Sequence, residues 1–341
     1  MKSGSEQLEK FLEAGWVMRI LVATLAVYLL LSFILGIFWN SEPEPFSVNE
    51  AAAAHAQQNN RTVTTGYTTT VALMTVTQTL LDKRGGYLSN DVFPPGLWLD
   101  NIPRWEFGVL VQVRDLSRAM RKDFSRSQSQ STEDLDLSIA EPQFHFDNHS
   151  WALPDSEGEY RRGIDKLNAY ILRLSDSANR QSQFYARSDN LRSWLKDVET
   201  RLGSLSQRLS ASVGQKRINT DLAGDGAAQQ STANESEFEA KTPWLQIDDV
   251  FYEARGTAWA LIHFLKAMEV DFADVLHKKN ALVSVKQIVR ELEATQQSIW
   301  APMILNGDGF GMTANHSLVM ASYIARANAA IIDLRALLAQ G

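Results

Sequence analysis

The sequence of 341 residues contains no cysteine at all. This absence excludes disulfide bonds, zinc sites built on thiolates and cysteine nucleophiles. The chain also has no excess of positive charge, because 33 Lys and Arg stand against 40 Asp and Glu, for a net charge of -7. A protein that binds nucleic acid needs a basic face to neutralise phosphates. We therefore expect no nucleic-acid partner.

The signatures of common active sites are missing as well. The sequence has no G-x-S-x-G, no phosphate-binding loop and no dinucleotide fingerprint. Glu235 precedes a serine, as in lytic transglycosylases, but it lies in a stretch of low complexity. We favour a non-catalytic protein without a cofactor, and an enzyme that cleaves cell-wall glycan through a carboxylate is the alternative. Its candidate carboxylates lie mostly off the apolar stripes, where charged side chains face water: Asp248, Asp249, Glu253, Glu269, Asp271, Asp274, Glu291 and Glu293.

One long apolar run near the N-terminus is the clearest feature that the sequence does have. The nineteen residues from Ile20 to Phe38 carry no charge, and at about 1.5 Å per residue they suffice for a hydrocarbon core of about 30 Å. The run ends in Phe38 and Trp39, which suit a membrane interface, and not in the small residues of a signal-peptide cleavage site. Residues 17–39 therefore predict an uncleaved transmembrane anchor, with the lipid bilayer as a partner.

The positive residues near this anchor predict its orientation. Lys2, Lys10 and Arg19 precede or begin the apolar run, whereas the next positive residue after it is Arg61. Since Lys and Arg are retained on the cytoplasmic side, residues 1–16 are expected to form a short cytoplasmic tail. The remainder would then lie in the periplasm, attached to a bacterial inner membrane by a single span.

Composition divides the exported part into four segments. We expect a spacer at 40–61, a helical region at 62–211, a flexible linker or loop at 212–241, and a C-terminal helical region at 242–341 that packs on the first. Residues 62–81 are ambiguous, because their Thr and Val favour a strand while their apolar residues also fit a helical stripe. We predict a helix there and leave the strand open.

The longest helical pattern is an unbroken heptad seam from Ile247 to Val275. Thr242 is placed to cap this helix and Pro243 to occupy its first turn. Gly256 lies off the seam and would permit the close approach of another helix. This pattern favours long helices that pack along their whole length.

Further helical seams complete the predicted fold. Leucine-rich seams occupy 167–178 and 191–209, with a polar stretch between them that is either a break or a stutter. Other helices are expected at 282–299, ended by Pro302, and from Thr313 onward. The fold class that follows is all-α: an N-terminal transmembrane helix followed by an elongated periplasmic helical bundle with coiled-coil-like hairpins.

The segment "VFPPGLWLDNIPRWEFGVLV", residues 92–111, concentrates prolines and aromatic residues. Its second half reads as a helix capped by Asp100 or Asn101, with Pro103 and Glu106 near its start. The aromatic residues either anchor a non-helical corner on the bundle or form an exposed patch that binds a protein partner. The candidate partner-binding residues are Phe93, Trp98, Trp105 and Phe107.

The one cluster with metal-like content is "HFDNH". In an extended strand, His145, Asp147 and His149 would share one face, as two imidazoles and a carboxylate for a divalent ion. The alternative is a set of surface histidines in a loop that docks on helices. The glycine-rich segment 305–317 resembles the start of a calcium loop but lacks its twelfth-position Glu, so we expect a helix-to-helix turn capped by Thr313.

Three stretches together resemble a known family: "GGYLSNDVFPPGLWLDNIPRWEFGVLVQVRDLSRAMR", the apolar anchor, and the C-terminal "ANAAIIDLRALL". The chain is similar, over nearly its whole length, to an uncharacterised family of proteobacterial inner-membrane proteins known as a domain of unknown function. The resemblance implies a single-pass membrane protein of a Gram-negative bacterium. It brings no catalytic motif with it.

The hypothesis that fits these features best is a membrane-anchored periplasmic interaction or scaffold module of the cell envelope. It would bind an envelope protein, and its heptad seams would also allow self-association. One alternative is the glycan-acting enzyme described above. The other is an accessory subunit of an envelope signalling or transport complex.

Overall fold

The computed structural model describes residues 15–127, 132–176, 178, 182–218, 237–299, 303–307 and 312–340. Most of the predicted cytoplasmic tail, Pro302, and the middle of the predicted linker at 212–241 lie outside the described residues. The same holds for part of the polar stretch between the leucine seams and for part of the loop at 305–317.

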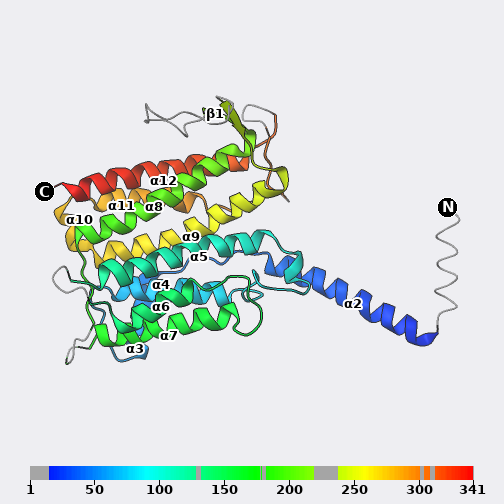
Figure 1. Ribbon diagram of the computed structural model, residues 1–341, viewed down its shortest axis with the longest axis horizontal. Helices are drawn as coiled ribbons and strands as arrows, with labels where there is room; N and C mark the ends of the chain where they lie inside the picture. Colours follow the sequence, from blue (N-terminus) through cyan, green and yellow to red (C-terminus); the bar gives the residue numbers. More distant parts are fainter. Residues whose placement is uncertain are drawn as a thin grey trace, which may run out of the picture.

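The apolar run forms one helix, α2 (Trp16–Trp39), which projects from one end of the body (Figure 1). It is long and apolar enough to cross a membrane, and a signal sequence would pass the same test. Helix α12 (His316–Ala339) is also long and apolar enough, but it packs against α8 and α11 in the body. The predicted N-terminal apolar helix is therefore present.

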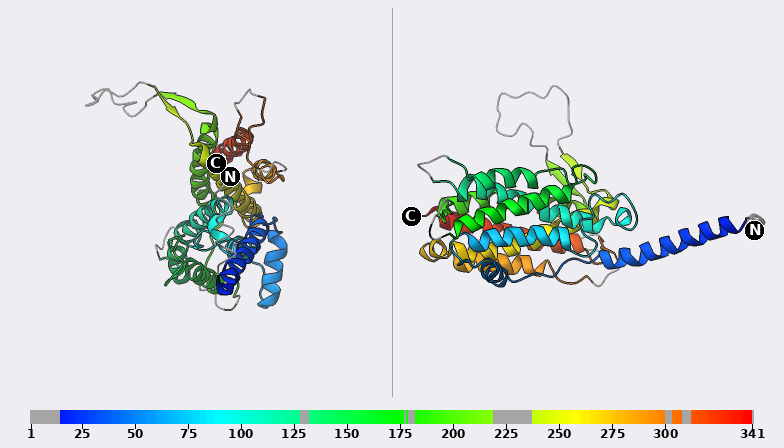
Figure 2. Two further views of the ribbon diagram at one scale, coloured as in Figure 1. Left: turned by 90° about the vertical axis from the view of Figure 1, so that its right-hand side faces the viewer. Right: turned by 90° about the horizontal axis from the view of Figure 1, so that it is seen from below.

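The body is built from helices that lie side by side along its long axis (Figures 1 and 2). The helix predicted at 62–81 is confirmed. The two leucine seams, for which a break or a stutter was left open, lie on two separate helices. The only strands in the described part of the chain are β1 (Gln215–Ile218) and β2 (Glu237–Ala240), an antiparallel pair. The body helices are α3 (Val48–Gln58), α4 (Tyr67–Asp82), α5 (Asn101–Ala119), α6 (Leu135–Phe144), α7 (Ser156–Leu174), α8 (Ser188–Ser210), α9 (Ile247–Asp271), α10 (Ala273–Lys278), α11 (Leu282–Ala294) and α12.

Helices α5 and α9 occupy the middle of the body. On one side of them lie α8, α11 and α12, and on the other lie α3, α4, α6 and α7 (Figure 1). Helix α9 contacts members of both groups, and 19 of its 25 residues are buried. The predicted C-terminal region therefore packs on the N-terminal region through a shared core.

Two glycines allow α5 and α9 to touch backbone to backbone. A Cβ atom placed on Gly256 would lie 2.0 Å from the carbonyl oxygen of Trp105, and one placed on Gly108 would lie 2.2 Å from that of Glu253. No real side chain fits at such distances, so the crossing requires glycine on both helices. The expectation that Gly256 permits close helix approach is met by α5.

Several helix ends differ from the expected ones. Helix α9 begins at Ile247 after a 3₁₀ turn, η4 (Trp244–Gln246), so Thr242 does not cap it. The heptad helix also stops at Asp271, and α10 continues after a break at Phe272. Helix α12 is capped by Asn315, whose side chain accepts a hydrogen bond from the Leu318 amide, and not by Thr313.

The cap of α5 is the predicted one. The Asp100 side chain accepts a hydrogen bond from the Asn101 amide at the start of the helix. Pro103 then lies in the first turn, where its missing N–H costs nothing. The cap could be predicted from the sequence because the capping residue and the start of the helix are neighbours in the chain.

We predict that Gly256→Ala and Gly108→Ala each destabilise the body by at least about 1–3 kcal/mol, since the added methyl groups overlap backbone atoms. Gly203→Ala in α8 is the matched control, because its Cβ would meet nothing closer than 3.5 Å. The control should be neutral or stabilising by up to about 1 kcal/mol from helix propensity. Urea unfolding of the full chain in detergent, followed by circular dichroism, measures all three; equal effects would contradict the close crossing.

Candidate functional site at the α2 end of the body

The segment that follows α2 is fastened to α9 by a buried ion pair. The Glu42 carboxylate accepts hydrogen bonds from the Arg255 guanidinium, at 2.7 Å from Nε and 2.6 Å from Nη2. Arg255 also donates to the Thr295 carbonyl oxygen at 2.8 Å, and its side chain is 7 % exposed. Glu42 is only three residues beyond the end of α2 at Trp39. The ion pair therefore connects the segment just after the C-terminal end of α2 to helix α9 in the middle of the body.

A second contact follows four residues later. The Phe46 amide donates to Nε2 of His263 at 3.0 Å, and the two rings stack with centroids 4.0 Å apart. His263 Nδ1 donates in turn to the Trp259 carbonyl oxygen at 2.7 Å. Burial lowers the pKa of His263 from 6.5 to about 4, so the imidazole is neutral at neutral pH. Only this neutral form can accept the bond from Phe46.

These contacts correct the expected spacer at 40–61. Helix α3 buries Val48, Ala52 and Ala56 against its neighbours, and it packs on α4 and α9. The alanine-rich composition suggested a tether, but small side chains also let a helix lie close to another one. The segment is thus a packed part of the body and does not separate the body from α2.

The loop between α4 and α5 is held by a second buried ion pair. The Lys83 ammonium contacts both the Glu106 carboxylate and the Gly86 carbonyl oxygen, and the Lys83 and Glu106 side chains are 2 % and 0 % exposed. The same carboxylate accepts bonds of 2.8 Å from the amides of Leu88 and Ser89. Glu106, expected to be an acidic residue at a helix start, is instead the internal anchor of this loop.

The four predicted partner-binding residues lie in different environments. Trp105 is fully buried and packs against Trp259, with ring centroids 5.2 Å apart. Trp105 therefore belongs to the core. This agrees with the first of the two interpretations of these aromatic residues, in which they anchor a corner on the bundle. Phe93 and Trp98 are exposed on the loop before α5, at 72 % and 49 %, and Phe107 is half-buried. The exposed aromatic surface consequently excludes Trp105.

Phe107 lines a groove of about 450 Å³ beside the start of α5. The groove also brings together the predicted residue His149 and the carboxylate Asp249. Its walls come from three parts of the chain: Leu99, Asp100, Pro103, Arg104 and Phe107, then Asn148 and His149, then Leu245 and Asp249.

The groove combines apolar walls with charged groups. Arg104 Nη2 lies 3.0 Å from Asp249 Oδ2. Burial raises the pKa of the Asp249 carboxyl, and the positive charge of Arg104 opposes this rise. Trp244 and Leu245, in the 3₁₀ turn η4 just before α9, are largely exposed. Arg104, Trp244 and Leu245 were not predicted as site residues. Trp244 and Leu245 did carry a signal, because this apolar pair lies before, and outside, the heptad seam.

The predicted metal cluster is not brought together. His145 Nδ1 lies 3.0 Å from the Glu141 carbonyl oxygen of its own helix, whereas His149 Nδ1 lies 2.9 Å from the Ser89 carbonyl oxygen. Asp147 accepts a hydrogen bond from the His149 amide within a turn. Among the described residues there is no group of three or more His, Asp or Glu side chains placed to hold a metal ion. The extended strand that would align the three residues does not form there.

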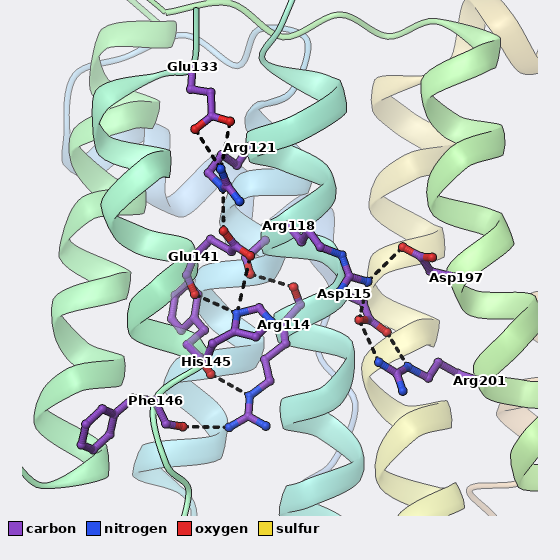
Figure 3. A network of polar contacts seen from close by, with 12 residues as sticks. Arg114, Asp115, Arg118, Arg121, Glu133, Glu141, His145, Phe146, Asp197 and Arg201 are labelled. Carbon is purple, nitrogen blue, oxygen red and sulfur yellow. Dashed lines mark hydrogen bonds and ion pairs between the residues drawn. The ribbon is translucent and has the colours of Figure 1, made fainter.

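His145 lies instead at the edge of a charged network on α5 (Figure 3). Arg121 binds Glu141 and Glu133, and Arg114 donates to the carbonyl oxygens of Phe144 and Phe146, both at 2.8 Å. On the other flank of α5, the buried Asp115 binds Arg118 and Arg201, and Arg118 also reaches Asp197 of α8. This network holds α6 and α8 to α5.

The carboxylates considered for acid–base chemistry also support the fold. Glu253 binds Arg208 of α8 with bonds of 2.7 and 2.5 Å, and Asp271 accepts a 2.7 Å bond from the Thr69 amide at the start of α4. The remaining candidates on α9 and α11 include three that form ion pairs on the surface: Glu269, Glu291 and Glu293. The observed arrangement of these groups links helices to one another.

Comparison with known proteins identifies a family. A family model described as "Uncharacterized protein conserved in bacteria (DUF2333)" matches residues 11–341. Because this match covers nearly the whole chain, the chain belongs to that family, and the resemblance seen in the sequence is confirmed. No curated protein and no solved structure matches the chain.

We predict that Glu106→Ala costs about 3–5 kcal/mol of stability, because it leaves the buried Lys83 ammonium without its carboxylate. Asp82→Ala is the matched control: Asp82 pairs with Arg161 at 2.7 Å, but both side chains are more than half exposed. Such a surface pair is worth about 0–1 kcal/mol. The difference in urea midpoint between the two variants is the measurement, and similar midpoints would show that Glu106 does not anchor the loop.

The lowered pKa of His263 predicts a stability that falls with acidification. The pKa of His263 is 6.5 in the unfolded chain and about 4 in the folded chain. At a pH between these two values, His263 binds a proton in the unfolded chain but not in the folded one. The free energy of unfolding should therefore decrease by about 2 kcal/mol from pH 7 to pH 5 through this one group. His263→Gln should lose that part of the pH dependence, whereas His277→Gln, at an exposed position, controls for the substitution itself. Parallel pH profiles for all three proteins would refute the assignment.

Proposed function

We propose that this member of the DUF2333 family is a membrane-anchored, non-catalytic interaction module of the bacterial cell envelope. In this proposal α2 spans the inner membrane with its N-terminus in the cytoplasm, and the helical body lies in the periplasm. The observation that carries the proposal is the position of the groove between α5, the loop at 145–149 and α9. It is lined by residues at the beginnings of α5 and α9, and these helices begin at the end of the body from which α2 leaves (Figure 1).

The properties of α2 support a membrane span. Its 24 residues extend about 36 Å, and most of its apolar side chains are exposed. Arg19 lies near its N-terminal end, and no Lys or Arg follows until Arg61. By the positive-inside rule, this asymmetry favours a body on the outer face of the membrane.

The packing around Glu42 supports a role close to the bilayer. Because Glu42 and Phe46 are bound to α9, little free chain separates α2 from the body. Helix α9 also supplies Asp249 to the groove. The groove would consequently stay near the membrane surface, within reach of the first periplasmic residues of another membrane protein.

The chemistry of the groove indicates the kind of segment it would bind. Leu99, Phe107 and Leu245 offer apolar contacts. Asp100 and Asp249 contribute negative charge, and Arg104, which pairs with Asp249, offsets one of the two. The partner segment we expect has an apolar anchor residue flanked by Lys or Arg. An accessory subunit of an envelope signalling or transport complex would also bind its partner close to the membrane. That alternative is therefore compatible with the same groove.

The proposal predicts a site-specific crosslink in living cells. A photoreactive phenylalanine analogue at Leu245, or at Phe107, should yield one dominant protein adduct in the bacterium that carries this protein. Asp249→Lys should weaken that adduct by about tenfold, since it reverses the charge that faces a basic segment.

The control position is Val283, which is exposed in the first turn of α11, next to α10 at the other end of the body. An adduct that also forms from Val283, or that is indifferent to Asp249→Lys, would count against the groove as the binding surface. Identification of the adduct by mass spectrometry would name the partner.

A further inference from the structure

We propose that the loop Val92–Leu99 inserts into the bilayer beside α2, so that the protein enters the outer leaflet of the inner membrane at two adjacent points. This inference rests on the proposed membrane span of α2. It assigns the exposed aromatic residues Phe93 and Trp98 to lipid, and it leaves the groove for a protein partner.

The composition of the loop is that of a lipid-facing segment. Its eight residues, "VFPPGLWL", carry no charged or hydrogen-bonding side chain apart from the indole of Trp98, and Asp91 and Asp100 bound it on either side. Phe93 and Leu97 are 72 % and 60 % exposed. An uncharged, exposed apolar loop between two carboxylates fits a segment whose ends stay in the headgroup region while its middle contacts acyl chains.

The loop is held directly against the apolar helix. The Tyr28 hydroxyl donates a hydrogen bond of 3.0 Å to the Pro94 carbonyl oxygen. Gly36 faces Pro95 and Leu99, because a Cβ placed on it would lie 3.5 Å from Cβ of Pro95. Ser32 and Gly36 are the buried residues of α2. Tyr28, Ser32 and Gly36 are spaced by four residues, so they lie on one face of the helix. The loop contacts this face at Tyr28 and again at Gly36.

The position of these contacts along α2 sets the depth of the loop. Tyr28 lies eleven residues before Trp39, the last residue of the helix, which corresponds to about 16 Å. Half of a hydrocarbon core is about 15 Å. Gly36, which faces Pro95, lies three residues before Trp39, or about 4–5 Å. With Trp39 at the interface, Pro94 and Pro95 therefore lie between the levels of Gly36 and Tyr28, within the outer leaflet. Trp39 and Trp151 line the same hollow as Asp91 and Phe93, and they suit the interfacial belt above the loop.

The backbone of the loop meets the requirement that lipid imposes on irregular structure. Unpaired peptide groups are costly in hydrocarbon. Pro94 and Pro95 have no N–H to satisfy. The amides of the following residues bond within the loop, from Leu97 to Phe93, Trp98 to Pro95 and Leu99 to Gly96. The Pro94 carbonyl oxygen accepts the hydrogen bond from the Tyr28 hydroxyl of α2. Three amides and the carbonyl oxygens of residues 93–96 are thus paired within the protein before the loop meets lipid.

The absence of cysteine makes the test direct. Single cysteines placed at Phe93 and at Leu97 in the full chain are labelled with a nitroxide after reconstitution into lipid nanodiscs. Collision rates with oxygen and with a neutral nickel complex are then measured by electron paramagnetic resonance. Leu30→Cys, exposed on α2, is the reference inside the membrane, and Leu135→Cys, exposed at the start of α6, is the reference in water.

Insertion predicts an oxygen-to-nickel collision ratio at both loop positions about tenfold above that at Leu135, because oxygen concentrates in hydrocarbon and the polar complex is excluded. If Leu30 gives the high ratio while Phe93 and Leu97 resemble Leu135, the loop is not inserted, but the membrane anchor stands. If Leu30 itself resembles Leu135, both the anchor and the insertion are wrong. Thermal unfolding of each labelled variant verifies that the exposed substitutions leave the fold intact.

Discussion

The contact between α5 and α9 is the constraint on which the rest of the structure depends. Gly108 and Gly256 bring the two backbones together in the middle of the body, with the helices of each side packed around them. The start of α5 carries the capped turn, Glu106 and one wall of the groove. The start of α9 carries the opposite wall. The crossing therefore fixes the width of the groove without any residue of the groove taking part in it.

Helix α9 also connects the candidate site with the apolar helix. Asp249 lines the groove, and Arg255 and His263 hold the segment that leaves α2. These three side chains lie within four turns of one buried helix, so they move as a unit. Packed structure therefore joins the groove to the C-terminal end of α2, in place of the spacer that was expected at 40–61.

Local sequence signals anticipated the parts of the structure that depend on neighbours in the chain. The apolar run, the Asp100 cap and the heptads each form a periodic or short-range pattern, and each lies on a helix. The heptad helix is shorter than predicted, because it breaks at Phe272. The groove could not be predicted in the same way, because its walls come from segments near residues 100, 148 and 245. The burial of Glu106 and the division of the histidine cluster likewise depend on tertiary contacts. A charged residue near a helix start gives no local sign that a lysine 23 residues earlier will face it.

The binding of Arg114 to the end of α6 has a consequence for the stability of that helix. Helix α6 has ten residues and contains Pro142, and a helix of this length is marginal in water by itself. Its last carbonyl groups, at Phe144 and just beyond at Phe146, are satisfied by the guanidinium of Arg114 on α5. Helix α6 packs on both α5 and α7, so its stability in the native state comes from these neighbours and not from its own sequence. A substitution that removes the Arg114 guanidinium would therefore act on α6 although it lies on another helix.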